Sequence, residues 1–269
     1  MARYPRLMPT HPRMYSAEVV RTERISPSFQ RVTIASADLA EFDWRGLDHW
    51  FRLFLPVAPG TGLRLPDVQG RVWWKSYLSI PDEERPHCSN YTVAAYRNLG
   101  EVGELDIDVV LHWHDGTLSG VAAWSAEAEI GSPVGILDQG VLFDPPDDTS
   151  AYVLVADESG LPAIRGILRD LPTDAVGTAI IEVPAADDVH DVQAPERVRV
   201  HWVPRDETGD LVGHRALKAL KALRGCQAPR PDAYAFVVGE SSLATQGRRA
   251  LHRAGLAKDR ITFSGFWKA

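Results

Sequence analysis

The sequence predicts two domains, a six-stranded β-barrel followed by an α/β domain with a mostly parallel sheet. In the first half of the chain, short segments of alternating apolar and polar residues follow one another closely, which is typical of a barrel. After Ala151, apolar strands alternate with helical patterns, which predicts a parallel sheet. The segment Phe143–Asp148 holds two prolines among acidic residues, so we expect the domains to span residues 1–145 and 146–269.

Within the first domain, the expected barrel strands share short length and close spacing. They are Ser16–Glu23, Phe29–Ala35, Trp50–Leu55, Val72–Ile80, Asn90–Tyr96 and Leu105–Trp113. The last one alternates most regularly, because every second residue from Leu105 to Leu111 is apolar and points to one face. A short helix at Val121–Ala128 and a closing strand at Val134–Leu137 complete the domain.

The second domain begins with Ala151–Ala156, a continuously apolar segment of the kind that is buried on both faces of a sheet. Further strands are expected at Thr178–Val183, Val198–Val203, Ala233–Val238 and Arg260–Ser264. Helical spacing of apolar residues predicts helices at Leu161–Leu171, Leu211–Leu223 and Ser242–Ala254.

Composition and charge narrow the function classes. Of 269 residues, 45% are apolar and 24% charged, as in an ordinary globular protein. The net charge of −7 argues against nucleic acid or an anionic membrane as a partner. There is no apolar window of membrane-spanning length, and the segment up to Arg13 lacks the apolar run of a signal peptide, so we expect a cytoplasmic protein. Cys88 and Cys226 have no metal-ligand neighbours; we expect two reduced thiols, with one disulfide as the alternative, and no metal site.

Two turns in the second domain follow strands and precede helices, which is where ligands bind in open α/β sheets. Asp157 and Glu158 stand in the first turn, and Gly239 and Glu240 in the second. The alternative is that Glu158 and Ser159 only cap a helix and complement its dipole. The first turn has no G-x-G-x-x-G motif, and its acidic side chains would repel a pyrophosphate.

Aromatic and polar residues on strands are the other candidates. Tyr91, Thr92 and His112 lie on expected barrel strands, and Trp267 lies near the end of the chain. Trp267 would stack on a planar ligand or fill the core, and by default Tyr91 and His112 have structural roles. The chain contains no H-E-x-x-H, C-x-x-C or G-x-S-x-G motif, so zinc chemistry and the common serine-hydrolase mechanism have no support.

The order of these patterns resembles the siderophore-interacting proteins, a branch of the ferredoxin-reductase-like flavoproteins. The resemblance runs from about Arg13 to the C-terminus, and its most specific stretch is Val155–Pro172. Other matching segments are Tyr15–Leu55, Tyr91-Thr92, Val110-Leu111-His112, Trp124, Gly239-Glu240, Arg249 and Gly265-Phe266-Trp267. The resemblance implies an FAD-binding barrel of the flavin-reductase type and an NAD(P)H-binding-type α/β domain. It also implies reduction of ferric siderophores with electrons from NAD(P)H or a ferredoxin.

The resemblance also assigns site residues, and the sequence departs from it at the phosphates. It implies that the isoalloxazine lies against Tyr91 and Thr92, and that the FAD phosphates contact the helix of Trp124 and an arginine two residues before the tyrosine. Here that position is Ser89, a second arginine of relatives, three residues after the tyrosine, is replaced by Ala94, and the turn before Trp124 lacks the serine of relatives. Charge-assisted hydrogen bonds are each worth roughly 1.5–3 kcal/mol, so the losses would weaken FAD binding by about two to four powers of ten.

These losses favour the hypothesis of a repurposed relative that needs no flavin. Its inherited pocket would bind a largely apolar small molecule and catalyse a cyclisation or isomerisation in natural-product biosynthesis. Tyr91 or His112 would donate a hydrogen bond, and Asp157 or Glu158 would accept one. The expected ligand- or cofactor-binding residues are Tyr91, Thr92, His112, Trp124, Gly239, Glu240 and Trp267. One alternative is an FAD-dependent NAD(P)H ferric-siderophore reductase, with Gly239 and Glu240 serving the nicotinamide nucleotide; another is a binding module without chemistry.

Overall fold

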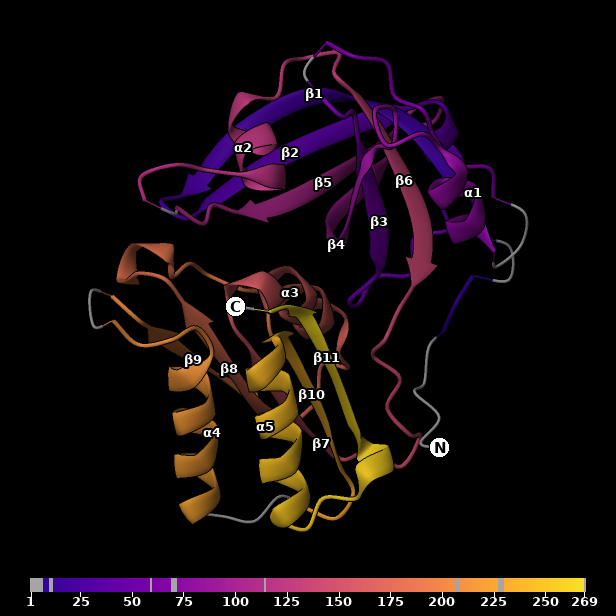
Figure 1. Cartoon of the computed structure of the whole chain (residues 1–269). Coiled ribbons are helices and arrows are strands. Elements are labelled where there is room, and N and C mark those ends of the chain that lie inside the picture. Colours follow the sequence, from indigo (N-terminus) through magenta and orange to yellow (C-terminus); the bar gives the residue numbers. More distant parts are fainter. Residues whose placement is uncertain are drawn as a thin grey trace.

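The computed structural model describes residues 7–9, 12–58, 60–68, 72–113, 115–206, 209–226 and 230–268, with the side chains of 224–226 left out. Two domains follow one another along the chain, and their shared boundary runs across the middle of the molecule (Figure 1). The first is a closed barrel and the second a five-stranded sheet with helices, which confirms the expected fold class. The expected domain boundary lies between Gly140, where the last barrel strand ends, and Ala151, where the sheet begins.

Six strands close the barrel in the order β1-β2-β5-β4-β3-β6. Their bounds are β1 Met14–Ser26, β2 Phe29–Ser36, β3 Trp50–Leu55, β4 His87–Asn98, β5 Gly103–Val110 and β6 Pro133–Gly140. Every neighbouring pair is antiparallel, and the barrel core is filled by alternate apolar residues of each strand. The helix α2 (Gly120–Glu127) packs against β2 and β5.

The expectation of a strand at Val72–Ile80 is wrong, because this segment contains the helix α1 (Trp73–Ser79). Trp73 and Tyr77 both pack on Phe54, with ring centroids 5.8 and 6.0 Å from it. Residues four apart lie on one face of a helix and can contact the same side chain. On a strand they would be about 13 Å apart, too far to share one ring. The aromatic residues that suggested a strand therefore cover Phe54 from a helix.

The second domain is a parallel sheet in the order β11-β10-β7-β8-β9. Its strands are β7 Ala151–Ala156, β8 Gly177–Val183, β9 Val198–Pro204, β10 Ala233–Glu240 and β11 Ile261–Trp267. One face packs on α3 (Leu161–Asp170), and the other on α4 (His214–Cys226) and α5 (Ser241–Arg253). Single 3₁₀ turns lie at Asp38–Glu41, Glu158–Gly160, Ala186–Asp188 and Lys258–Arg260. No helix of the described ranges is long and apolar enough to cross a membrane.

α3 lies between the sheet and the barrel, as Figure 1 shows, and the two domains share part of a core. Phe29, a barrel residue that is 1% exposed, packs in the same cluster as the apolar face of α3 and the inner sheet residues. Side-chain carboxylates tie the domains at the edges of this contact. Asp188 accepts from the Ser26 hydroxyl (2.6 Å) and the Ser28 N–H (2.9 Å), and Asp170 accepts from the Leu47 N–H (2.5 Å). These ties fix the width of the space between the domains.

The structure describes the side chain of one of the two cysteines, Cys88. Cys88 is a free thiol on β4, and burial raises its pKa, so it is protonated at neutral pH. The side chain of Cys226 lies outside the described residues, as does most of the segment before Arg13.

Candidate functional site

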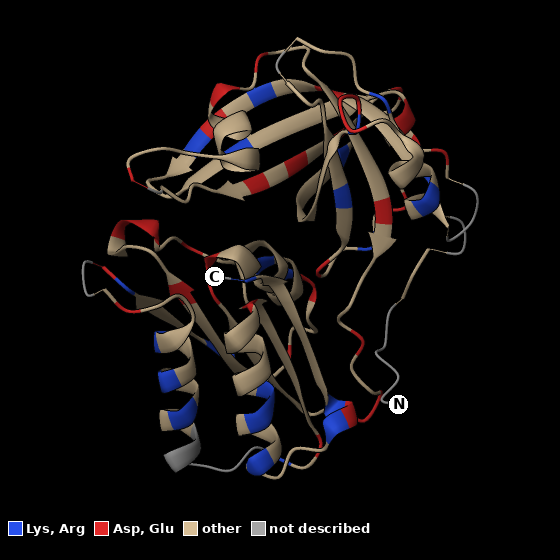
Figure 2. Ribbon diagram, viewed as in Figure 1, with Lys and Arg blue, Asp and Glu red and all other residues tan. Residues whose placement is uncertain are grey.

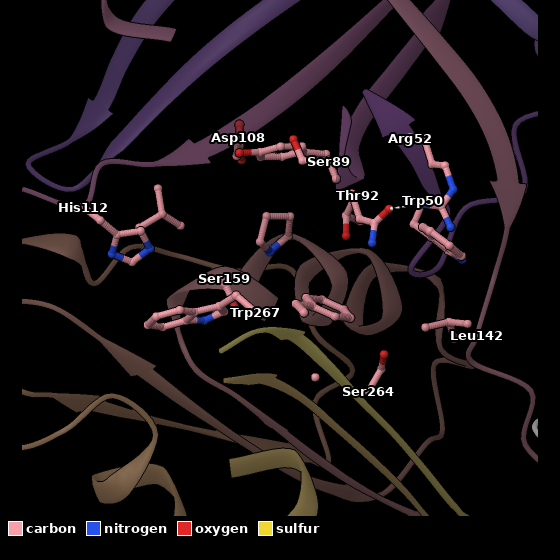
Figure 3. A pocket seen from close by; sticks show the side chains of 16 residues that line it. Trp50, Arg52, Ser89, Thr92, Asp108, His112, Leu142, Ser159, Ser264 and Trp267 are labelled. Carbon is pink, nitrogen blue, oxygen red and sulfur yellow. Dashed lines mark hydrogen bonds between the residues drawn. The ribbon is translucent and has the colours of Figure 1, made fainter. Parts of the chain in front are cut away.

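A cavity of about 470 Å³ lies between the barrel and the sheet domain, a size in the range of small-molecule and cofactor sites. The barrel side is formed by β3, β4 and β5, and the opposite side by the start of α3 and the end of β11 (Figure 3). Both strand ends and the helix are held in place by the shared core, so the cavity is a fixed feature of the domain contact. Of the residues expected at a site, Tyr91, Thr92, His112 and Trp267 all line it.

Arg52 on β3 brings a guanidinium to this cavity. It is the register partner of Asn90 on β4, and its Nη1 donates to the Asn90 Oδ1 at 3.1 Å. Its Nε is buried and has no hydrogen-bond acceptor among the described residues. Arg52 was not among the residues expected from the sequence, because it lies on β3, outside the Tyr91-Thr92 motif of β4. The strand register, which a single sequence does not show, places this cation beside β4 from the neighbouring strand.

Asp108 is the one carboxylate among the described residues that line the cavity, and two arginines neutralise it. Arg31 contacts it in bidentate fashion at 2.7 and 2.8 Å, and Arg165 of α3 donates to it at 3.2 Å. The hydrogen bond to Asp108 raises the pKa of Arg31, whereas burial lowers that of Arg165. The lining therefore does not repel an anion, although the chain as a whole carries a net charge of −7.

The positive charge near the cavity is local rather than part of the larger basic surface. Figure 2 shows lysine and arginine along α4 and α5, the helices on the far face of the sheet. Arg52 of β3 lines the cavity, whereas Arg31 of β2 and Arg165 of α3 lie behind the lining and bind Asp108. Arg97, the arginine downstream on β4, is bound to Asp106 at 2.7 and 2.8 Å and to Glu104 at 2.9 Å. Its charge is therefore engaged within the barrel.

Tyr91 and Thr92 lie side by side on β4 in the cavity wall. Burial strongly raises the pKa of the Tyr91 phenol, so the ring is neutral over the whole physiological range. Thr92 is the register partner of Trp50, which lines the same wall. This wall offers flat aromatic surface next to hydroxyl donors, as a planar ligand with polar edges requires.

His112 and Trp267 meet across the cavity, with ring centroids 5.4 Å apart. Burial lowers the pKa of His112, so its imidazole is neutral near pH 7 and can both donate and accept a hydrogen bond. The Trp267 Nε1 is buried and has no partner in the part of the chain that the structure describes. It is an N–H donor that a ligand carbonyl can satisfy.

Asp157 is fully buried and joins the ends of two strands rather than lining the cavity. Its carboxylate accepts from the N–H (2.9 Å) and hydroxyl (2.6 Å) of Ser159, and from the N–H of Glu240. Burial, and next the charge of Glu158, raise the pKa of Asp157 to about 7. Ser159, held by Asp157, does line the cavity. Asp157 therefore contacts the site through its neighbour, and its expected catalytic role stays a prediction.

Glu158 points into the sheet domain and lies in a buried ion-pair network. It binds Arg205 through both oxygens at 2.6 and 2.7 Å, and Arg205 also contacts Glu182 at 2.8 Å. Glu182 in turn accepts from the N–H groups of Gly213 and Ala216, both at 2.7 Å, which fixes the start of α4. These contacts account for Glu158 structurally, and the catalytic role expected for it stays a prediction.

The remaining expected residues lie next to the site. Gly239 has φ +122°, and a Cβ there would meet the Asp157 carboxylate at 2.4 Å, so only glycine fits. Glu240 caps α5 by accepting from the N–H groups of Ser242 and Leu243 at 2.5 and 3.2 Å. Trp124 packs against the barrel core from α2. Their expected cofactor-binding roles stay predictions.

Comparison with known proteins identifies the class to which this fold and cavity belong. Residues 18–142 match the family model for the siderophore-interacting FAD-binding domain, so the barrel is of the FAD-binding type. Residues 149–269 match the model for siderophore-interacting protein. The chain belongs to the siderophore-interacting protein family.

Relatives with named activities are reductases. The chain is 30% identical to ferric vibriobactin reductase ViuB of Vibrio cholerae, over 98% of this chain and 90% of that protein. It is 29% identical to the NADPH-dependent ferric-chelate reductase of Escherichia coli, over 99% of this chain and 98% of that protein. A siderophore utilization protein from T. fusca has the same fold, with a TM-score of 0.80 and 28% identity over 98% and 95% of the two chains.

These relatives overturn one expectation. The hypothesis of a flavin-independent cyclase or isomerase of natural-product biosynthesis is wrong, because the named relatives are ferric reductases and the barrel matches an FAD-binding family. The chain is an enzyme. The loss of two arginines from β4 was read as the loss of the cofactor, whereas Arg52, Arg31 and Arg165 keep the cavity compatible with an anionic ligand.

The cavity fits the isoalloxazine of FAD. Tyr91 and Trp267 provide flat apolar faces, and Thr92 and the unpaired indole N–H of Trp267 provide donors for ring carbonyls. The one lining carboxylate, Asp108, is neutralised by its two arginines. Near the expected phosphate contact the lining offers the uncharged Ser89 and Asn90. The residues therefore fit the ring, and Ser89, Asn90 and the neighbouring Arg52 would contact the phosphates.

Proposed function

We propose that the protein is an FAD-dependent reductase that takes electrons from NAD(P)H and delivers them to ferric siderophores. The observation that carries this proposal is the cavity at the domain boundary, where Tyr91 and Thr92 of the FAD-type barrel face His112 and Trp267. Its flat walls and hydrogen-bond donors suit a flavin ring. The activities of the Vibrio cholerae and Escherichia coli relatives support the same reading.

The chain's own residues would bind and orient the cofactor. Tyr91 supplies a neutral ring surface, and the Thr92 hydroxyl a hydrogen bond to the ring edge. Bound FAD would supply the link between two-electron transfer from NAD(P)H and one-electron transfer to ferric iron. The charge of Asp108 is neutralised by Arg31 and Arg165, so the cavity wall would not repel anionic reactants. Ser159, oriented by Asp157, and Trp267 line the side nearer the sheet, where the strand ends offer room for the nicotinamide nucleotide.

The electrons balance over the whole reaction. One NAD(P)H is oxidised to NAD(P)⁺ and gives up two electrons and one proton. Each ferric complex accepts one electron, so two ferric siderophores become ferrous and one proton is released to water. The ferrous ion leaves because hard oxygen ligands hold Fe(II) less tightly than Fe(III).

The test begins with the protein purified without added flavin. We expect FAD to bind, with quenching of its fluorescence, and NAD(P)H then to reduce a ferric siderophore under anaerobic conditions. A ferrous-specific chelator should trap two Fe(II) for each NAD(P)H consumed. The isosteric substitution Thr92→Val should weaken FAD binding roughly threefold to tenfold, because one hydrogen bond to the ring is lost.

The matched control is Thr22→Val, an exposed threonine on β1, which should leave FAD binding unchanged. A protein that binds no FAD at high micromolar concentration, or that forms no Fe(II) when loaded with FAD, would refute the proposal.

A further inference from the structure

Positive charge is concentrated on α4 and α5, in a chain that is acidic as a whole. α4 holds four lysines and arginines between His214 and Cys226, and α5 holds three between Ser241 and Arg253. Neither helix contains an aspartate or a glutamate, and Figure 2 shows blue bands but no red ones on both helices. Because the net charge of the chain is −7, its acidic residues are concentrated elsewhere.

Four of these cations share one exposed surface, which we call the basic face. They are Lys218 and Lys221 of α4, and Arg249 and Arg253 of α5. The two helices pack against each other, and a Cβ on Gly247 of α5 would lie 3.7 Å from the Leu220 side chain of α4. Packed helices lie about 8–10 Å apart, so the four charges stand on one flat surface made by both helices.

The cations of the basic face have no acidic partner in the part of the chain that the structure describes. By contrast, Arg215 of α4 is bound to Asp210 at 2.6 Å and is not part of this face. A cation in the last turn of a helix complements the helix dipole, which accounts for Arg253. The dipole does not account for Lys218 and Lys221, because they lie in the middle of α4. Their charge is therefore available to an anionic partner.

The residue types of the two helices favour a lipid surface over other anionic partners. Protein interfaces are enriched in aromatic residues and depleted in lysine, and proteins that bind single-stranded nucleic acid stack the bases on aromatic side chains. Neither α4 nor α5 contains a phenylalanine, a tyrosine or a tryptophan. Cations spread over a flat surface match a plane of phosphate headgroups.

The acidic part of the chain lies far from the basic face. α4 and α5 cover one face of the sheet, whereas α3 covers the other face and the barrel lies beyond α3 (Figure 1). At about 0.1 M salt, charges more than about 10 Å apart are largely screened from each other. The net charge of −7 argues against an anionic membrane only if the charge is evenly spread, and here the local charge decides.

We propose that the basic face binds anionic phospholipid headgroups and holds the protein flat on a membrane surface. A lysine or arginine close to an anionic membrane strengthens binding by roughly fivefold, so four of them acting together give a marked preference for anionic lipid. The cavity between the domains lies on the other side of the sheet from this face. A protein docked in this way keeps its cavity open to water.

The experiment measures co-sedimentation of the full chain with large unilamellar vesicles. One set contains equal parts of phosphatidylglycerol and phosphatidylcholine, and the other contains phosphatidylcholine alone. At about 0.1 M salt we expect at least tenfold stronger binding to the anionic vesicles. At about 1 M salt, where the screening length falls to about 3 Å, this preference should disappear.

Variants assign the binding to the basic face. The pair Lys218→Gln with Lys221→Gln, and the pair Arg249→Gln with Arg253→Gln, should each weaken binding to the anionic vesicles by roughly tenfold to thirtyfold. The pair Lys218→Arg with Lys221→Arg keeps the charge and should bind like the parent. Thermal unfolding by calorimetry shows that each variant is folded, since exposed positions contribute little to stability.

The matched control is the pair Arg21→Gln with Arg24→Gln on β1. These arginines are exposed on the barrel, and their removal changes the net charge as much as either pair of the basic face. Vesicle binding of this control should equal that of the parent.

Three results would overturn the inference. The first is equal binding to both kinds of vesicle. The second is a loss of binding in the Arg21 and Arg24 control as large as in the basic-face pairs, which would make net charge the cause. The third is tighter binding to a DNA duplex or to polyglutamate than to the anionic vesicles, which would give the face to a nucleic acid or to an acidic protein. None of these measurements involves FAD or iron, so the proposed reductase function stands or falls separately.

Discussion

Ser89 occupies the position on β4 where the family resemblance expects an arginine for the FAD phosphates, and it lines the cavity. We expect the substitution Ser89→Arg to tighten FAD binding, because it adds a charge-assisted hydrogen bond to a phosphate. At about 1.5–3 kcal/mol for such a bond, the dissociation constant should fall roughly tenfold or more. Fluorescence titration with FAD measures this change directly.

The control for this substitution is Ser16→Arg, which adds the same charge at an exposed position on β1. It should not alter FAD affinity. If Ser89→Arg leaves FAD affinity unchanged or weaker, the phosphates do not lie along β4 at this position.

Individual residues of the site could be predicted from the sequence where they belong to a local sequence motif. Tyr91, Thr92 and His112 follow from the resemblance and do line the cavity. Arg52 was not predictable, because its place depends on the pairing of β3 with β4, and register is a property of the folded sheet. Glu158 lies after a strand in the sequence, as a ligand-binding residue would, yet its partner Arg205 is 47 residues away and could not be seen from the local pattern.

At the scale of elements, eleven of the twelve expected strands correspond to strands of the structure, because alternation and buried apolar runs are local signals. The exception is Val72–Ile80, where aromatic residues of high β-propensity form α1. The tertiary contacts of Trp73 and Tyr77 with Phe54 favour a helix in this segment. The bounds of β4 and β5 also differ from the expectation, since strand ends depend on the partner strand.

The segment that links the domains is held by Asp48, which precedes β3. Its buried carboxylate accepts from the N–H groups of Leu142 (3.1 and 3.3 Å) and Phe143 (3.0 Å). Burial raises the pKa of Asp48 to about 6, while backbone hydrogen bonds oppose this shift. Between about pH 4 and pH 6 the carboxyl is ionised in the unfolded chain and protonated in the folded one. The free energy of unfolding therefore falls as the pH rises through this window.

We expect Asp48→Asn to remove this contribution, because asparagine does not titrate and its Oδ1 can still accept from both N–H groups. Urea unfolding at pH 4.5 and pH 7 should show that the variant loses less free energy of unfolding between these pH values than the parent, by about 1–3 kcal/mol. Asp43→Asn, at an exposed position in the same loop, should behave like the parent. An Asp48→Asn profile parallel to that of the parent would contradict the assignment.

For the whole molecule, Asp188 is the clearest tie between the domains. It is fully buried and accepts from Ser26 and Ser28 of the β1–β2 turn, and from the Ala185 N–H at 3.1 Å in its own domain. We expect Asp188→Ala to lower the free energy of unfolding by about 1–3 kcal/mol, since buried donors lose their acceptor. Thermal unfolding followed by calorimetry should also show a broader transition, as the two domains become less coupled.

Asp187 provides the matched comparison, because it stands in the same turn and is exposed. Asp187→Ala should change the free energy of unfolding by less than about 0.5 kcal/mol. If both alanine variants behave alike, the effect belongs to the turn and not to the tie between domains.

Phe29 has a consequence for how the protein is made. A ribosome finishes all six barrel strands before it begins β7, so the barrel can close while the second domain is still missing. During that interval the Phe29 ring, later 1% exposed against α3, faces solvent on the surface of a nascent chain. Chaperones recognise such transiently exposed apolar groups, and truncated chains that end before α3 keep them permanently. We therefore expect the barrel produced alone to be prone to self-association, because it lacks the α/β domain that buries Phe29 in the full chain.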